Sequence, residues 1–470
     1  AGAALYAQTP AAALTARQQA AMRFLKDSID LHIHMDAPTN ISPGTDIAHM
    51  QAAKALGVRG WLLKSHGEST ASLAWQLRQQ TPDFEVFGSV SLNWATGGIN
   101  PAAVEHMAAQ EARHLAAFDR LRGLIMVLMA IDHASFMVAR VHAYEGWAFP
   151  AGPVTLTRWI THLCAPGFLM LLGAGMVWLG KARQQAGWTH AQIRRFFLTR
   201  GLLLLVIQHL VENPAWVIGM IGADPSTQVV QAPSPGGGTP FFLHFGVISA
   251  LAVAMIVWAF LIELPSVVIL AVSGAAMAAS VWMTPPMADA ATLFPAWKLF
   301  LFVPSHTNAV DVLYPFVPWL VPAGIGIVLG RIVYKAPSKT VVVTAAAGVA
   351  LVLAHFALAH LGFRAFLKYP PTPAFFTITL GIDLLLIALF TALPANPLTA
   401  VLETFGRSPL FFYLLHLYVF ALAGLAFRTG TTLPVMYAVW AAGLAVMYPM
   451  VAAYARFKAA KPATSVWRML

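Results

Sequence analysis

The chain has 470 residues, of which 58% are hydrophobic and only 10% are charged, and its mean hydropathy is +0.68. Soluble globular chains are typically ~45–50% apolar and ~25% charged, so the composition excludes a protein whose whole surface faces water. The net charge of +10 does not indicate nucleic-acid binding, because the basic residues stand in short clusters between apolar runs. The single cysteine, Cys164, excludes an internal disulfide framework and a thiolate metal cluster.

The N-terminal part, residues 1–110, has a mixed composition in which short apolar runs alternate with helical patterns. We predict strands over 28–34, 57–66 and 85–93. We predict helices over 44–56, 68–80 and 101–117. Alternation of this kind favours parallel strands. The sequence therefore predicts a small, partial α/β segment of three β-α units.

The first predicted strand ends in His32-Ile33-His34, which places two imidazoles on one side of the strand, as a metal would need. The stretches DLHIHMDAPTN, RGWLLKSHGEST and VFGSVSLNWATGGINPAAVE resemble the start of a family of predicted metal-dependent amidohydrolases, over residues 20–108. The resemblance implies part of a (β/α)8 barrel, with Lys64 or His66 as further site residues. By comparison with that family the later metal ligands are missing, so we expect a partial layer without a stably bound metal.

From residue 118 to 460 the chain is almost continuously apolar. A helix needs ~20 apolar residues to cross ~30 Å of hydrocarbon. We predict membrane-spanning helices near 122–141, 158–180, 196–221, 241–262, 266–284, 310–334, 340–362, 374–394, 408–428 and 433–455. The stretch 293–304 is too short to span and is expected at the interface. The predicted fold is an all-α polytopic membrane bundle of about ten transmembrane helices.

Basic residues predict the orientation of the bundle. If the first span starts inside, most Lys and Arg residues fall inside, including those at 181–195 and 335–339, and both ends of the bundle are cytoplasmic. The loop 222–240 has no basic residue and fits outside. Residues 1–10 resemble the end of a secretory signal, which leaves the side of the N-terminal segment open.

Small residues at helical spacing indicate where helices approach closely in lipid. Gly326 and Gly330 form one such pair, and Gly173, Ala174 and Gly175 form a second small-residue site.

Ionisable residues within spans are costly and are therefore candidates for function. Asp132 and His133 lie ten and eleven residues beyond Arg122, which is ~15–17 Å along a helix. His133 suits a general base and Asp132 suits the carboxylate that orients it. Neighbours on a helix nevertheless point ~100° apart and can contact different partners. A structural polar contact between helices is the alternative. His142, at the outer end of the same span, is a candidate for catalysis or an interfacial anchor.

Further polar residues lie at the ends of later spans or within them. The candidates for a substrate cavity are His162, His209, Glu212, Asn213, Tyr413 and His416. His209 and Glu212 are three residues apart, which predicts a shared helix face. Each histidine by itself is more often structural, but together they predict a polar cavity that opens outward and that His133 faces. His244 begins the fourth span, and the case is weaker for Asp383, His355 and His360.

The runs RLRGLIMVLMAIDH, HLCAPGFLMLLGAG, FLTRGLLLLVIQHLVENPAW, LYPFVPWLVPAGIGIVLGR and FGRSPLFFYLLHLYVF resemble the heparan-α-glucosaminide N-acetyltransferase-like family of bacterial membrane proteins, over residues 118–460. The lysosomal relatives take acetyl-CoA from the cytosol and acetylate an amino sugar on the other face, with a central histidine. Those relatives have an asparagine where this chain has His133, and their central histidine lies nearest to His142. The resemblance implies a multi-pass protein of the bacterial inner membrane.

We therefore expect a membrane-embedded acyltransferase that moves an acetyl or other acyl group from acyl-CoA to a sugar or similar acceptor, without a metal. His133, with Asp132, is the expected base and His142 its alternative, while Arg122 and Arg407 are expected to bind the anionic donor. The expected partners are membrane lipid and a small-molecule or glycan acceptor, not nucleic acid, and a homodimer is one open option. The alternative is a proton-coupled transporter or a non-catalytic membrane protein.

Overall fold

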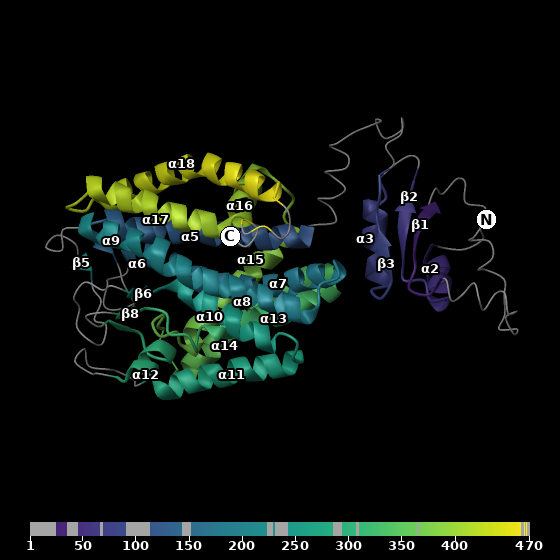
Figure 1. Cartoon of the computed structure of the whole chain (residues 1–470), viewed down its shortest axis with the longest axis horizontal. Helices are drawn as coiled ribbons and strands as arrows, with labels where there is room; N and C mark the ends of the chain where they lie inside the picture. The colour runs from purple at the N-terminus through teal and green to yellow at the C-terminus, as the bar shows by residue number, and fades with distance from the viewer. Residues whose placement is uncertain are drawn as a thin grey trace, which may run out of the picture. The chain divides into compact units, whose positions relative to one another are not determined.

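The chain divides into two compact units, Ala1–Leu115 and Ala116–Leu470. A computed structural model (Figure 1) describes residues 25–34, 46–65, 69–90, 113–142, 152–222, 229–230, 243–284, 294–306, 310–363, 366–461, 465 and 467. Each unit is described by itself below.

The N-terminal unit contains the predicted parallel sheet. Its strands β1 (Ile29–His34), β2 (Gly60–Lys64) and β3 (Glu85–Phe87) pair in the order β1-β2-β3, and the helices α2 (Asp46–Ala55) and α3 (Ala71–Gln80) connect them. Met50, Leu63 and Val86 are fully buried in a small apolar core. The three predicted strands and the first two predicted helices are thus confirmed, whereas most of the helix predicted over 101–117 lies outside the described residues. The side chains of His32, His34 and His66 lie outside the described residues.

The second unit is a helical bundle, which confirms the predicted fold class. Its helices are α5 (Arg113–Val138), α6 (Pro153–Thr161), α7 (Cys164–Gln185), α8 (His190–Ile207), α9 (Asn213–Gly222), α10 (Val247–Leu261), α11 (Ser266–Met283), α12 (Ala296–Leu301), α13 (Leu320–Lys335), α14 (Thr340–His360), α15 (Pro373–Ala392), α16 (Pro397–Arg407), α17 (Pro409–Ala426) and α18 (Leu433–Ala459). Within the described residues, eight helical segments are long and apolar enough to cross a membrane. Large apolar side chains such as Trp282, Val342 and Leu353 are exposed on outward faces, as lipid contact requires.

Two of the predicted spans are shorter helices in the structure. Helices α10 and α13 have 15 and 16 residues, or roughly 22–24 Å at 1.5 Å per residue. The first residues of these predicted spans instead form the strands β6 (Leu243–Phe245) and β8 (Val310–Val312), which pair in parallel. Each extended segment satisfies the backbone polar groups of the other, so neither needs to extend its helix.

The short strands lie at one end of the bundle (Figure 1). Strand β7 (Ser305–His306) joins β8 to complete a three-stranded sheet, and β4 (Val141–His142) pairs with β5 (Val229–Val230). His142 therefore stands in a strand beyond the end of α5, not on the helix itself. The same end carries α12, a helix of six residues in the stretch that the sequence marks as too short to span.

The third predicted span contains a π-helix, η3 (Gln208–Glu212), between α8 and α9. A π-helix has a wider turn than an α-helix, so residues three apart no longer lie above one another. The prediction that His209 and Glu212 share a face is accordingly wrong. His209 is half-buried beside Phe245, whereas Glu212 is fully buried and bonds to other partners.

Helices α7 and α13 pack closely along small residues, as the sequence predicts. A Cβ atom at Gly173 would collide with the Ala323 backbone, and one at Gly326 would collide with the Met170 backbone. Gly330 likewise lies against Ala174. Gly175 is different, because a Cβ atom there would meet nothing within 4 Å.

A histidine pair and a basic cavity within the bundle

The centre of the candidate site is a pair of histidines from α5 and α17. His133 Nδ1 lies 2.6 Å from His416 Nε2, and the two rings are nearly coplanar. His416 Nδ1 lies 3.1 Å from the Phe412 carbonyl oxygen, which can only accept, so Nδ1 carries the proton. A neutral His416 then accepts at Nε2 from His133 Nδ1–H. This tautomer leaves the lone pair of His133 on Nε2, where a general base needs it.

Aromatic side chains enclose this histidine pair. The Trp216 ring meets His133 edge-on at 5.0 Å between centroids, and Tyr413 contacts both histidines. Tyr413 donates its hydroxyl to Glu212 Oε1 at 2.6 Å, and Trp216 Nε1 donates to the same oxygen at 3.1 Å. The π-helix thus places a buried carboxyl group that fixes both rings. The other oxygen, Glu212 Oε2, has no hydrogen-bond partner among the described residues.

Asp132 does not orient His133, although it precedes it in the chain. Both of its carboxylate oxygens lie 2.6 Å from Arg158 Nη1 on α6, and Thr161 donates to it at 3.2 Å. The ion pair is almost inaccessible, with 7% of the Arg158 side chain and 15% of the Asp132 side chain exposed. Adjacent helix positions diverge by ~100°, which sends the two side chains to different neighbours. Asp132 therefore joins α5 to α6, and the orienting group for His133 is His416.

His142 and His162 are both buried, but the structure gives them other contacts. His142 Nδ1 lies 3.0 Å from the Ser135 hydroxyl, and its ring packs against Phe136. The ring of His162, in the turn between α6 and α7, packs against aromatic rings, and its Nδ1 has no hydrogen-bond partner among the described residues. Among the described residues, neither His142 nor His162 has a hydrogen bond or a ring contact to the His133–His416 pair.

Asn213 anchors strand β6 to the start of α9. Its amide nitrogen donates to the His244 carbonyl at 3.3 Å, and its oxygen accepts from the His244 backbone N–H at 3.2 Å. His209 Nδ1 lies 3.2 Å from the same amide. These contacts hold the end of the bundle together, and His209 contacts Asn213 and Phe245 there.

Sequence reasoning missed a buried Asp–His pair at this end of the bundle. His244 Nδ1 donates to Asp311 Oδ2 at 2.6 Å, between the paired strands β6 and β8. His244 Nε2 and Glu212 Oε1 both approach Gly246, at 2.7 and 3.1 Å from where its Cβ would lie. Asp311 stands at the start of a predicted span, where no local pattern indicated a strand. The pairing of β6 with β8 brings the two residues together across 67 positions.

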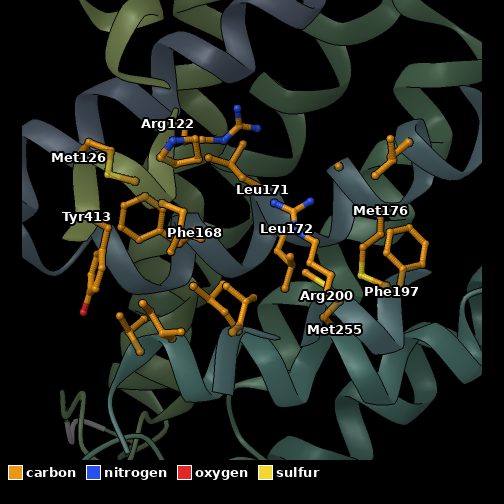
Figure 2. A pocket seen from close by; sticks show the side chains of 18 of the residues that line it. Arg122, Met126, Phe168, Leu171, Leu172, Met176, Phe197, Arg200, Met255 and Tyr413 are labelled. Carbon is orange, nitrogen blue, oxygen red and sulfur yellow. The ribbon is translucent and has the colours of Figure 1, made fainter. Parts of the chain in front are cut away.

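A cavity of about 300 Å³ lies between α5, α7, α8, α10 and α17. Its walls are mostly apolar, with Phe168, Met176 and Phe197 among them, and four basic residues also line it: Arg122, Arg200, Arg407 and Lys458. Figure 2 shows Tyr413 and Phe197 toward opposite ends, with Arg122 and Arg200 between them. The two arginines predicted to bind an anion therefore share one cavity.

Arg200 and Lys458 are the cationic residues of the cavity that the sequence did not single out as ligands. Arg122 is paired with Asp119 at 2.6 Å, and Arg407 with Glu403 at 3.0 Å. Arg200 Nε is buried and has no hydrogen-bond partner among the described residues. An arginine in this setting favours an anionic ligand, because a buried donor without a partner is costly. Arg200, like many other basic residues, served in the sequence analysis only to predict the topology.

Tyr413 connects the cavity to the histidine pair. It lines the cavity, and its ring also contacts His133 and His416 at 6.2 and 5.4 Å between centroids. His133 itself is not among the residues that line this cavity. One tyrosine therefore connects the cavity, which has apolar walls and four basic residues, to the oriented imidazole of His133.

Comparison with known proteins gives two family matches. Residues 27–156 match a family of unknown function (DUF6282), which assigns no activity to the N-terminal unit. No curated protein matches the chain significantly. Residues 114–369 match the family described as heparan-alpha-glucosaminide N-acetyltransferase, catalytic. Since that match covers more than half of the 470 residues, the chain belongs to the heparan-alpha-glucosaminide N-acetyltransferase catalytic family.

Proposed function

We propose that this protein is a membrane acyltransferase that takes an acetyl or other acyl group from acyl-CoA and passes it to a sugar or similar acceptor. The observation that carries the proposal is the basic cavity, which ends at a tyrosine in contact with the His133–His416 pair. Membership of an acetyltransferase family supports the same reaction class.

The cavity suits the thioester arm of the donor. Guanidinium and ammonium groups bind phosphate oxygens strongly, and Arg122, Arg200, Arg407 and Lys458 supply them. The apolar walls beyond these residues suit an uncharged pantetheine arm. A volume of about 300 Å³ is at the lower end for small-molecule sites, so the nucleotide stays at the mouth of the cavity.

The proposed chemistry uses His133 as the general base and His416 as its positioning residue. The acceptor amine or hydroxyl attacks the thioester carbonyl carbon and gives its proton to His133 Nε2. The carbon–sulfur bond then breaks, and the departing thiolate takes that proton from His133. The products are the acylated acceptor and free CoA thiol, and His133 returns to its starting tautomer.

The orientation follows the basic residues. In the predicted topology, in which the first span starts inside, Arg122, Arg200, Arg407 and Lys458 all fall on the cytoplasmic side. We place the donor entrance on that side, in the inner membrane of a bacterium. The acceptor then enters from the end of the bundle that carries the short strands.

The test is an assay of the purified protein in nanodiscs, in which acetyl-CoA and an amino sugar are supplied and free thiol is measured. We expect His133→Ala to abolish turnover while donor binding persists, because a base acts on the chemical step. His416→Ala should lower kcat and change its pH profile with little effect on KM. The matched control is His355→Ala, a half-buried histidine whose Nδ1 bonds to the Ala374 carbonyl. Wild-type levels of turnover in His133→Ala would refute the assignment, and absence of acyl-CoA binding in the wild type would refute the function.

A further inference from the structure

Asp383 is a carboxyl group within the bundle that the proposed chemistry does not use. It lies in the middle of α15 and has 0% of its surface exposed. Neither Oδ1 nor Oδ2 has a hydrogen-bond partner among the described residues. Buried carboxylates normally have ion-pair or hydrogen-bond partners, because desolvating a charge is costly.

The surroundings of Asp383 are apolar on the side of α7. A Cβ atom at Gly167 would lie 2.9 Å from Asp383 Oδ2 and 3.2 Å from Ile125, so the glycine leaves just the space that the carboxyl group fills. The titratable neighbour from α7 is Cys164, and its thiol donates to the Ile125 carbonyl at 3.2 Å. Within the described structure, no donor therefore lies within hydrogen-bonding distance of either carboxyl oxygen of Asp383.

We propose that Asp383 is a proton-binding site, a carboxyl group that holds its proton at neutral pH and thereby keeps α15 seated against α7. A protonated carboxyl carries no charge, so it can stay in this apolar interface at a much lower cost than a carboxylate. This site is separate from the basic cavity, because Asp383 does not line it. It is also separate from the histidine pair, because Asp383 has no hydrogen bond to either histidine among the described residues.

The position of Asp383 links proton binding to the donor cavity. Gly167 faces Asp383, and the next residue on α7, Phe168, lines the cavity. Loss of the proton would place a negative charge against this wall and push α7 away from α15. Proton occupancy and the shape of the cavity are therefore coupled through one helix.

Infrared spectroscopy of the protein in nanodiscs tests this proposal without reference to acyl transfer. At pH 7 the wild type should show a carboxylic-acid C=O band that Asp383→Asn lacks. The control is Asp83→Asn, which changes an exposed carboxylate of the N-terminal unit and should keep the band. A spectrum in which Asp383→Asn loses a carboxylate band instead, or loses no acid band, would overturn the proposal.

A second measurement covers the case in which Asp383→Asn does not fold. Wild-type protein with 13C-labelled aspartate carboxyl groups should show an acid band that shifts with the label. A hydrophobic carbodiimide adds across a protonated carboxyl, with the oxygen bonding to carbon and the proton moving to nitrogen. We expect the adduct to map to Asp383 by mass spectrometry. The absence of any label-shifted acid band at pH 7 would overturn the proposal.

Discussion

The Asp132–Arg158 ion pair provides a quantitative test of how the site is assembled. Breaking a buried ion pair by removing one partner typically costs about 3–5 kcal/mol, whereas replacing both partners with apolar residues is often neutral or stabilising. Exposed pairs contribute only ~0–1 kcal/mol. With 7% and 15% of the two side chains exposed, we assign this pair to the buried class.

The two single variants should lower the free energy of unfolding by different amounts. Lys368 is buried and lies close enough to Asp132 to attract its carboxylate. In Arg158→Met, Asp132 keeps this second positive charge. In Asp132→Leu, Arg158 and Lys368 remain as two cations without the carboxylate. We expect Asp132→Leu to destabilise the protein by about 3–5 kcal/mol and Arg158→Met by less, with the double variant less destabilised than Asp132→Leu.

The assay is unfolding in mixed micelles with increasing SDS, followed for the wild type and the three variants as a double-mutant cycle. A double variant as unstable as the sum of the singles would refute the pairing. The same proteins also test catalysis. Since Asp132 contacts Arg158 and not His133, the double variant should keep acyl transfer, and loss of turnover in a stable double variant would restore Asp132 to the catalytic set.

Three further predictions concern the packing of α7, the donor cavity and the topology. Gly173→Ala should cost about 1–3 kcal/mol because its Cβ would collide with α13, while Gly175→Ala should be tolerated; equal stabilities in the same unfolding assay would contradict this. Arg200→Ala should weaken acetyl-CoA binding about tenfold, or ~1.4 kcal/mol, and reduce its salt dependence in calorimetry; unchanged affinity would remove Arg200 from the site. A cysteine introduced in the loop 222–240 should react with an impermeant thiol reagent added outside, since the native Cys164 is buried; labelling only from the cytoplasm would reverse the topology.

The sequence by itself determined that most of this protein lies in lipid, and it determined the approximate positions of the helices. Hydropathy acts on each run separately, because a run of ~20 apolar residues is stable in lipid whatever its neighbours are. The close approach of Gly173, Gly326 and Gly330 to neighbouring backbones was predictable for the same reason. Helices in lipid gain contact where side chains are small, and the spacing of such residues is local.

The tertiary structure decided which side chains meet. Asp132 and His133 are neighbours in sequence, yet they bind partners on different helices, and His416 reaches His133 across 283 positions. Two departures from helix that the hydropathy pattern conceals also decided contacts. The π-helix turned Glu212 toward Tyr413, and the pairing of β6 with β8 brought Asp311 to His244.

The reason for this division is physical. Transfer into lipid depends on the composition of a segment, which the sequence contains directly. A hydrogen bond of 2.6 Å depends on the rotation and offset of two helices, and these are set by the packing of every helix between them. The membrane bundle was therefore predictable from each apolar run separately. The histidine pair, the basic cavity and the buried carboxyl group of Asp383 could be identified only from the packing of the whole bundle.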